Sequence, residues 1–265
     1  MTKFNDIDMK FWKESGVWTD SLWIIPERDK TGKHNGFYHG NFVPQIPHQL
    51  ILRYTKKDEV VFDPFVGSGT TAFEAESLKR NFIGIDIQKK LVSYVKNNIS
   101  AKENFSKLIV GDSTKIATFD KVQKILKDHA KKRVQFAILH PPYADIIKFS
   151  SLKGDLSNTR SLDEFLKKFS SVLKNCIELL DDGRYLAIVI GDKYTAGKWI
   201  PLGFYCMNAG EKLGLILKGI IIKNMSGNRA KQNKEAIWRY RALTSDYYIF
   251  KHEYIFIFKK KYGKH

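Results

Sequence analysis

The sequence predicts an α/β fold in which helices cover both faces of a mostly parallel sheet. From residue 59 onward, short apolar runs alternate with segments whose apolar residues recur at helical spacing. Strands that alternate with helices are typical of parallel sheets, because each helix returns the chain to the same edge of the sheet. Polar residues follow several of the apolar runs, where ligands bind in open α/β sheets. They are Asp63, Asp86, Asp112, His140 and Asp192.

Seven runs in this pattern are expected as strands. They are residues 59–65, 81–87, 106–113, 134–143, 184–192, 215–224 and 252–261. Six segments are expected as helices on their apolar periodicity. They are residues 46–55, 67–80, 89–104, 119–133, 161–183 and 203–214. No helix is expected between the last two strands, so they can pair antiparallel around a long loop.

Composition favours a nucleic-acid partner. The chain has 265 residues, with 45 Lys and Arg against 28 Asp and Glu, and a formal net charge of +17. A balance this basic favours a polyanionic partner, although lysines that are merely solvated are the alternative. We expect a single domain, residues 1–265, that begins with an irregular, aromatic-rich arm over residues 1–40.

The remaining composition predicts a cytoplasmic protein without a metal site. Cys176 and Cys206 are far apart in sequence and show no metal-ligand spacing. Two cysteines are too few for a disulfide framework, so a reduced setting is the default. The N-terminus lacks the apolar region of a signal peptide. No run reaches the roughly 18 apolar residues of a membrane span, so no membrane partner is expected.

A glycine-rich turn, Phe-Asp-Pro-Phe-Val-Gly-Ser-Gly-Thr-Thr, lies between the first strand and its helix at residues 62–71. Glycines at this position allow positive φ and a close approach of a ligand to the backbone. The helix N-terminus favours an anionic group. No Gly-Lys-Ser/Thr follows and the third glycine of the dinucleotide pattern is missing, which excludes both phosphate-binding motifs. A tight turn without a ligand is the alternative.

A second motif, His-Pro-Pro-Tyr at residues 140–143, ends a buried strand. The two prolines of the motif lack N–H groups and fix φ at about −65°, so they end the strand and hold the backbone rigidly.

Together, the two motifs resemble those of the amino-group DNA methyltransferases, which act on adenine N6 or cytosine N4 and use S-adenosylmethionine. The segments Gly-Asn-Phe-Val-Pro at residues 40–44, Ile-Gly-Ile-Asp-Ile at 83–87 and Val-Gly-Asp-Ser at 110–113 resemble further motifs of that family. The resemblance covers nearly the whole chain and implies a Rossmann-like methyltransferase fold with a seven-stranded sheet and an antiparallel last strand.

The resemblance also implies which residues bind the cofactor. Asp86 would bind the ribose hydroxyls and Asp112 the adenine amino group. Phe65 could instead be core packing, and Asp112 a turn cap. The full set implied to line the cofactor comprises Asn41, Phe42 and Pro44 at the methionine end, then Asp63, Pro64, Phe65, Gly67, Gly69, Thr70, Asp86 and Asp112.

The catalytic residues that the resemblance implies are His140, Pro141, Pro142 and Tyr143. An exocyclic amine is a poor nucleophile because its lone pair is delocalised into the ring. Acceptors placed against its N–H groups, such as the Pro141 carbonyl, favour a pyramidal nitrogen, and the rigid backbone holds that carbonyl in place. Tyr143 would stack on a base that has been flipped out of the duplex.

His140 departs from the family pattern, which has Asp, Asn or Ser at this position. A neutral imidazole can accept one hydrogen bond and a protonated one cannot, so we expect His140 to act in its neutral form. Shaping the pocket while Pro141 alone accepts is the alternative. No cysteine lies near the motif in sequence, which argues against covalent attack on a ring carbon.

The predicted function is therefore site-specific DNA methylation in a restriction–modification setting, with adenine favoured over cytosine on family frequency alone. An RNA amino-group methyltransferase, a protein-glutamine methyltransferase and a cofactor-binding subunit without catalysis are the alternatives. Double-stranded DNA is the expected partner, and a homodimer or a restriction or specificity subunit stays open.

Residues 224–252 are the leading candidate for a DNA-contacting loop, because they mix basic and aromatic side chains. Residues 1–40 and the segment after Tyr143 are further candidates. Packing of the aromatic rings on the sheet is the alternative. The candidate contact residues in the loop are Asn228, Arg229, Lys231, Trp238, Arg239 and Arg241.

Overall fold

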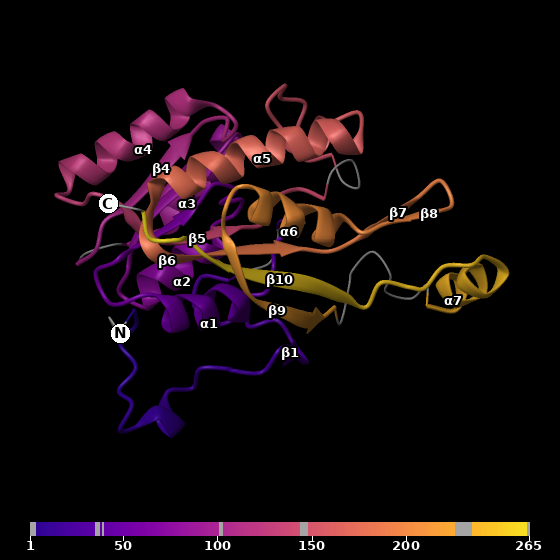
Figure 1. Ribbon diagram of the computed structural model, residues 1–265, viewed down its shortest axis with the longest axis horizontal. Helices are drawn as coiled ribbons and strands as arrows, with labels where there is room; N and C mark the ends of the chain where they lie inside the picture. The colour runs from indigo at the N-terminus through magenta and orange to yellow at the C-terminus, as the bar shows by residue number, and fades with distance from the viewer. Residues whose placement is uncertain are drawn as a thin grey trace.

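An eight-stranded mixed sheet forms the centre of the computed structural model, in the order β1-β9-β10-β6-β5-β2-β3-β4 (Figure 1). The structure describes residues 4–34, 38, 40–100, 103–143, 148–225 and 235–263. The strands of this sheet are β1 (Leu22–Trp23), β2 (Val60–Asp63), β3 (Asn81–Asp86), β4 (Ser106–Val110), β5 (Val134–Leu139), β6 (Leu180–Ile190), β9 (Ile216–Asn224) and β10 (His252–Lys259). Apart from β1, they correspond to the seven strands predicted from the sequence.

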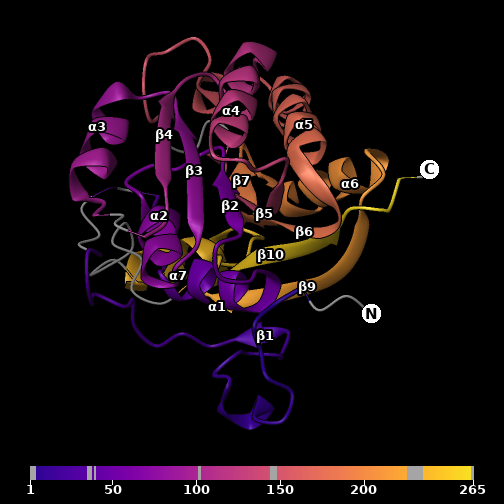
Figure 2. The same ribbon diagram turned by 90° about the vertical axis from the view of Figure 1, so that its left-hand side faces the viewer.

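Helices cover both faces of the sheet, as predicted (Figure 2). One hydrophobic layer lies under α1, α2 and α3, and the other under α4, α5 and α6. The helices are α1 (Gln45–Tyr54), α2 (Thr70–Ser77), α3 (Lys89–Asn98), α4 (Ile116–Asp128), α5 (Leu162–Leu179), α6 (Leu202–Lys212) and α7 (Glu235–Thr244), with short 3₁₀ turns η1 (Trp12–Glu14) and η3 (Leu156–Asn158). None of the described helices is long and apolar enough to cross a membrane.

The direction of the last strand is confirmed. β10 runs antiparallel to both of its neighbours, β6 and β9, while β5, β2, β3 and β4 pair in parallel. The carboxyl ends of the parallel strands therefore lie at the same edge of the sheet as the start of β10. The end of β9 also lies at this edge, because β9 and β10 are antiparallel. Side chains from the end of β9 and from the start of β10 can therefore meet there.

Three elements differ from the sequence prediction. β1 has two residues and pairs in parallel with β9 at the edge of the sheet, and it is too short to show a period of its own. Residues 193–202, for which no strand or helix was expected, contain the hairpin β7 (Lys193–Thr195) and β8 (Lys198–Ile200). Its turn places Ala196 and Gly197 at positive φ, as two-residue hairpin turns require. Residues 235–244, inside the expected loop, form α7.

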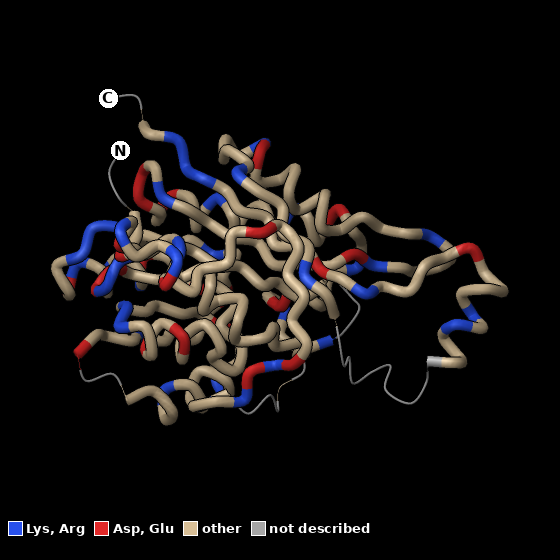
Figure 3. The backbone as a smooth tube through the Cα atoms, turned by 90° about the horizontal axis from the view of Figure 1, so that it is seen from below, with Lys and Arg blue, Asp and Glu red and all other residues tan. Residues whose placement is uncertain are grey.

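The hairpin β7–β8 and helix α7 form a projection beyond the sheet, which Figures 1 and 3 show on the right-hand side. We call β7, β8 and residues 235–251 the projecting arm. Two ring contacts join the hairpin to the segment after α7: Tyr194 with Tyr247 at 4.6 Å and Trp199 with Phe250 at 4.3 Å between ring centroids.

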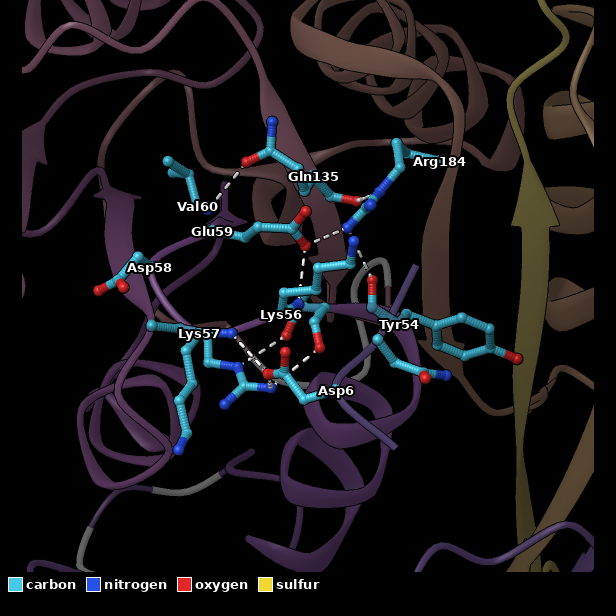
Figure 4. A network of polar contacts seen from close by, with 12 residues as sticks. Asp6, Tyr54, Lys56, Lys57, Asp58, Glu59, Val60, Gln135 and Arg184 are labelled. Atoms are coloured by element: carbon cyan, nitrogen blue, oxygen red, sulfur yellow. Dashed lines mark hydrogen bonds and ion pairs between the residues drawn. The ribbon is translucent and has the colours of Figure 1, made fainter. Parts of the chain in front are cut away.

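A polar network closes the opposite edge of the sheet, where the parallel strands begin (Figure 4). Arg184 forms an ion pair with Glu59 and donates to the carbonyl oxygen of Tyr54 at 3.1 Å. Asp6 accepts hydrogen bonds from the backbone N–H of Lys57 at 2.6 Å and from Arg80 at 3.0 Å. The network fastens the N-terminal segment to the side of the sheet away from the cavity described next.

Candidate active site

A cavity of about 580 Å³ lies at the carboxyl edge of the parallel strands. Both predicted motifs open onto it, together with the segment that precedes α1. The predicted site residues that line it are Asn41, Phe42, Pro64, Phe65, Gly67, Thr70, Asp86, His140, Pro141, Pro142 and Tyr143. The structure thus brings together residues from two motifs that are about 70 positions apart in sequence.

The glycine-rich turn is shaped by hydrogen bonds to two carboxylates, of which Asp63 is buried and Asp86 is half-buried. Asp63 accepts from the backbone N–H of Phe65 at 2.8 Å and from the Thr71 hydroxyl at 2.6 Å. It lies behind the wall of the cavity, and burial raises its pKa to about 7. Asp86 accepts from the backbone N–H of Gly67 at 2.9 Å and faces the cavity. Burial raises the pKa of Asp86 to about 6.

Both glycines of the turn need the conformation that glycine allows. Gly67 has φ +52° and Gly69 has φ +93°. A Cβ on Gly69 would lie 2.8 Å from Val95, so this glycine permits helix α2 to pack against α3. A Cβ on Gly67 would meet only ordinary contacts, the nearest to Tyr38 at 3.5 Å. Gly67 therefore shapes the side of the turn that faces the cavity.

Tyr38 and residues 40–43 form a further part of the cavity wall. The Asn41 side-chain amide donates to the Ser68 hydroxyl at 2.5 Å, which fastens the segment to the glycine-rich turn. Arg28 donates to the carbonyl oxygen of Phe42 at 2.9 Å. The Phe42 ring meets the His140 ring edge to face, with centroids 4.8 Å apart. Pro44 caps the start of α1 and does not line the cavity.

His140 lies half-buried at the end of β5, beside Phe42 and Tyr143. Its Nε2 atom lies 3.4 Å from the Tyr143 hydroxyl. Burial lowers the pKa of His140 to about 4, with smaller and opposing effects from Glu253 and Lys223. The imidazole is therefore neutral at physiological pH and retains one nitrogen that can accept a hydrogen bond, as its expected role requires.

Two charged residues of this wall were not among the predicted site residues. Lys223 and Glu253 line the cavity, and each side chain is only 8% exposed. They occur as charged residues within apolar runs, and in the antiparallel pair of β9 and β10 they stand directly opposite each other. The two charged residues within apolar runs are visible in the sequence, but only the register of β9 and β10 shows that they face each other.

Asp112 does not line the cavity. Its Oδ1 atom accepts from the backbone N–H and the hydroxyl of Thr114, at 2.8 and 2.7 Å, as expected for a turn cap. Gly154, which does line the cavity, lies directly against it, because a Cβ there would be 2.4 Å from Asp112 Oδ2. Asp155, from the turn before η3, is the carboxylate that reaches the cavity wall on this side. A cofactor-binding role for Asp112 stays a prediction.

The candidate DNA-contacting residues are only partly described. Trp238, Arg239 and Arg241 lie on α7 in the projecting arm, with the Arg241 guanidinium 5.5 Å from the Trp238 ring centroid. Asn228, Arg229 and Lys231 lie outside the described residues. Figure 1 shows α7 away from the sheet rather than packed on it.

Comparison with models of protein families shows the family to which the chain belongs. The family model described as DNA methylase matches residues 2–97 and 134–265, which is most of the chain. The chain belongs to the DNA methylase family. A second model, described as an RMKL-like methyltransferase domain, matches residues 50–163 of the chain.

Several curated proteins similar to this chain are type II methyltransferases. M2.LlaDCHI of Lactococcus lactis subsp. cremoris is 38% identical over 100 residues, which are 38% of this chain and 34% of that protein. M.MjaII of Methanocaldococcus jannaschii is 25% identical over 155 residues, 58% of this chain and 24% of that protein. M2.DpnII of Streptococcus pneumoniae is 36% identical over 86 residues, 32% of this chain and 30% of that protein. The matched segments thus span about a third or less of these relatives.

Solved structures support the Rossmann-like methyltransferase fold. TrmN from Thermus thermophilus superposes with a TM-score of 0.51 at 16% identity, over 83% of this chain and 49% of that chain. A SAM-dependent methyltransferase from Methanosarcina mazei superposes with a TM-score of 0.50 at 11% identity, over 81% and 98%. At these identities the similarity shows the fold of the chain and nothing about its activity.

S-adenosylmethionine is the cofactor of this family, and the cavity fits it. The volume lies within the range of about 300–1,000 Å³ that is usual for small-molecule sites. Gly67 leaves the backbone open to close approach, and the Asp86 carboxylate faces the cavity one strand away, where a ribose diol can donate to it. Within the described residues, no group of three metal-ligating side chains is placed to hold an ion.

Proposed function

We propose that this DNA methylase transfers the methyl group of S-adenosylmethionine to the exocyclic amino group of a flipped base in double-stranded DNA, at a specific sequence. The observation that carries the proposal is the shared cavity. The turn with Gly67 and Asp86 and the rigid segment His140–Tyr143 open onto the same space. The type II relatives support a restriction–modification setting. Adenine N6 is favoured over cytosine N4 on family frequency alone.

The chain's own residues would prepare the amine for transfer. When bound, the cofactor would supply an electrophilic methyl group. The turn around Gly67 and the Asp86 carboxylate would hold the cofactor in the cavity. His140 and the Pro141 carbonyl would accept hydrogen bonds from the N–H groups of the target amine. These bonds would favour a pyramidal nitrogen, whose lone pair can attack the methyl group. An imidazole whose pKa is about 4 is a weak base, so we assign His140 the role of acceptor and leave the released proton to water.

The direct test is the transfer of radiolabelled methyl groups to unmodified bacterial DNA, to bulk RNA and to protein. Label in DNA, followed by mass spectrometry that finds N6-methyladenine or N4-methylcytosine in its nucleosides, supports the proposal and settles the base. Label confined to RNA or protein contradicts it. Cofactor binding without any labelled product would assign the chain to the non-catalytic alternative.

We propose further that the projecting arm contacts the DNA backbone. α7 carries exposed Arg239 and Arg241. The cavity lies at the base of the arm, because Lys223 and Met225 precede α7 in sequence, Glu253 follows it, and all three line the cavity. A helix that extends beside the opening of a base pocket is well placed to reach the flanking phosphates.

Replacing both arginines, R239Q/R241Q, should weaken DNA binding. The dependence of the binding constant on salt concentration should also become shallower by about one to two phosphate contacts. Fluorescence anisotropy with duplex DNA at several salt concentrations measures both quantities. The matched control is K121Q/K124Q on α4, which removes the same charge from exposed positions outside the arm. Equal losses of affinity in the two variants would contradict a specific role for the arm.

A further inference from the structure

A buried ion pair forms part of the wall of the catalytic cavity. Lys223 Nζ lies 3.0 Å from Glu253 Oε1, and both residues are among the buried polar residues of the protein. The second oxygen of Glu253, Oε2, accepts a hydrogen bond from the Tyr143 hydroxyl at 2.9 Å. Glu253 therefore connects a cation on β9 to the ring that ends the His-Pro-Pro-Tyr motif.

Stability alone does not account for this pair. Removing two charges from water is costly, and apolar residues of similar volume often replace a buried ion pair without loss of stability. The neighbouring positions show that the sheet accepts apolar pairs here, since Ile222 faces Tyr254 and Ile221 faces Ile255 in the same register. The pair gives the Tyr143 hydroxyl a charged acceptor that an apolar pair would not provide.

Three contacts fix the plane of the Tyr143 ring. Its hydroxyl is held by Glu253, and its ring stands nearly perpendicular to that of His140, with an interplanar angle of 88° and centroids 5.7 Å apart. Gly191 lies against the ring edge, because a Cβ on Gly191 would be 3.2 Å from Tyr143 Cε2. A ring held at its far end presents one defined face to the cavity, which is what a stacking platform needs.

We propose that Glu253 is a positioning residue of the methylase: kept charged by Lys223, it holds the Tyr143 hydroxyl and so sets the ring face against which the target base stacks. This inference rests on the proposed function. Although burial raises the pKa of Glu253, the Lys223 ammonium and His140 lower it, and the net result lies below the ordinary value. The carboxylate is thus available as an acceptor throughout the neutral range.

The two charges of the pair act on His140 with opposite sign, so removing one alone would also change the imidazole. The test therefore uses two double variants in which the pocket carries neither charge. K223M/E253Q keeps an acceptor oxygen for the Tyr143 hydroxyl, and K223M/E253L has similar volume but no acceptor. Y143F removes the same hydrogen bond from the other side without disturbing the pair.

In single-turnover assays on unmodified bacterial DNA with saturating cofactor, K223M/E253L and Y143F should lose roughly 10- to 100-fold in the rate of methyl transfer. K223M/E253Q should recover most of the wild-type rate. The affinity for S-adenosylmethionine, measured by calorimetry, should be the same in all of them. Equal rates for the two double variants, or a loss that follows cofactor affinity, would overturn the positioning role.

The contact itself can be measured without activity. With tyrosine labelled at ¹³Cζ, the resonance of Tyr143, assigned by its loss in Y143F, should move in K223M/E253L and stay close to wild type in K223M/E253Q. An unchanged resonance in both would overturn the inference even if the enzyme methylates DNA. A wild-type protein that labels no DNA would contradict the proposed function instead. If K223M/E253L does not fold, comparison of Y143F with K223M/E253Q decides the rate question.

Discussion

Replacing Gly67 with Asp should weaken the binding of S-adenosylmethionine by about 100-fold or more, which isothermal titration calorimetry would register as a loss of about 3 kcal/mol. The new carboxylate would stand beside Asp86, whose Oδ2 already accepts from the Gly67 N–H at 2.9 Å. It would also occupy the side of the turn that faces the cavity. Since a Cβ at Gly67 meets no protein atom closer than 3.5 Å, we expect the substitution to affect the ligand more than the fold.

The matched control for this variant is Gly16→Asp. Gly16 also has positive φ, +64°, with nothing within 4 Å of an added Cβ, and it lies in the exposed N-terminal segment. Both variants place a non-glycine residue in the left-handed region, which costs roughly 1–2 kcal/mol of stability. Similar falls in melting temperature with cofactor binding lost only in Gly67→Asp would support the assignment. Unchanged cofactor affinity in Gly67→Asp would show that the turn does not hold the cofactor.

The sheet could be predicted from the sequence because its inner strands are buried on both faces. β5 has the sequence Val-Gln-Phe-Ala-Ile-Leu, and five of its six residues are buried, so the run is apolar regardless of the rest of the fold. The elements that the sequence did not predict are short or mostly exposed. β1 has two residues, β7 and β8 have three each, and α7 is mostly exposed, so none of them carries a strong apolar period.

The candidate site was predictable to the extent that its residues are contiguous in sequence. The turn around Gly67 and the segment His140–Tyr143 are each read within ten residues, and the structure places both on one cavity. The pair of Lys223 and Glu253 depends on antiparallel register across 30 positions, which no local pattern reports. Asp112 was predicted as a site residue, but it caps its own turn in the structure. Its position at the end of a strand does not by itself show whether the carboxylate faces the cavity.

His140 is the residue whose chemistry sets this site apart from the Asp, Asn or Ser of the family pattern. Its folded-state pKa, about 4, lies below the ordinary value of 6.5 because burial disfavours the charged form. The unfolded chain therefore binds the proton more tightly, and the stability that neutral His140 contributes is lost progressively as the pH falls from 6.5 toward 4. Above pH 6.5 this contribution is fully present.

His140→Leu should lower the rate of methyl transfer by about 100- to 1,000-fold, comparable with the removal of one polar group that stabilises a transition state. His140→Asn, which keeps an acceptor as the family pattern does, should lose far less.

The maximal rate of the wild-type enzyme should stay level from pH 8 to pH 5. It is measured with saturating cofactor, so that titration of Asp86 near pH 6 does not affect the rate. An imidazole with its ordinary pKa of 6.5 would instead cause a decline through that range. A pH profile that declines near 6.5 in the wild type but not in His140→Asn would show that His140 is exposed to solvent and protonated in the working enzyme, and would contradict the acceptor role derived from its burial.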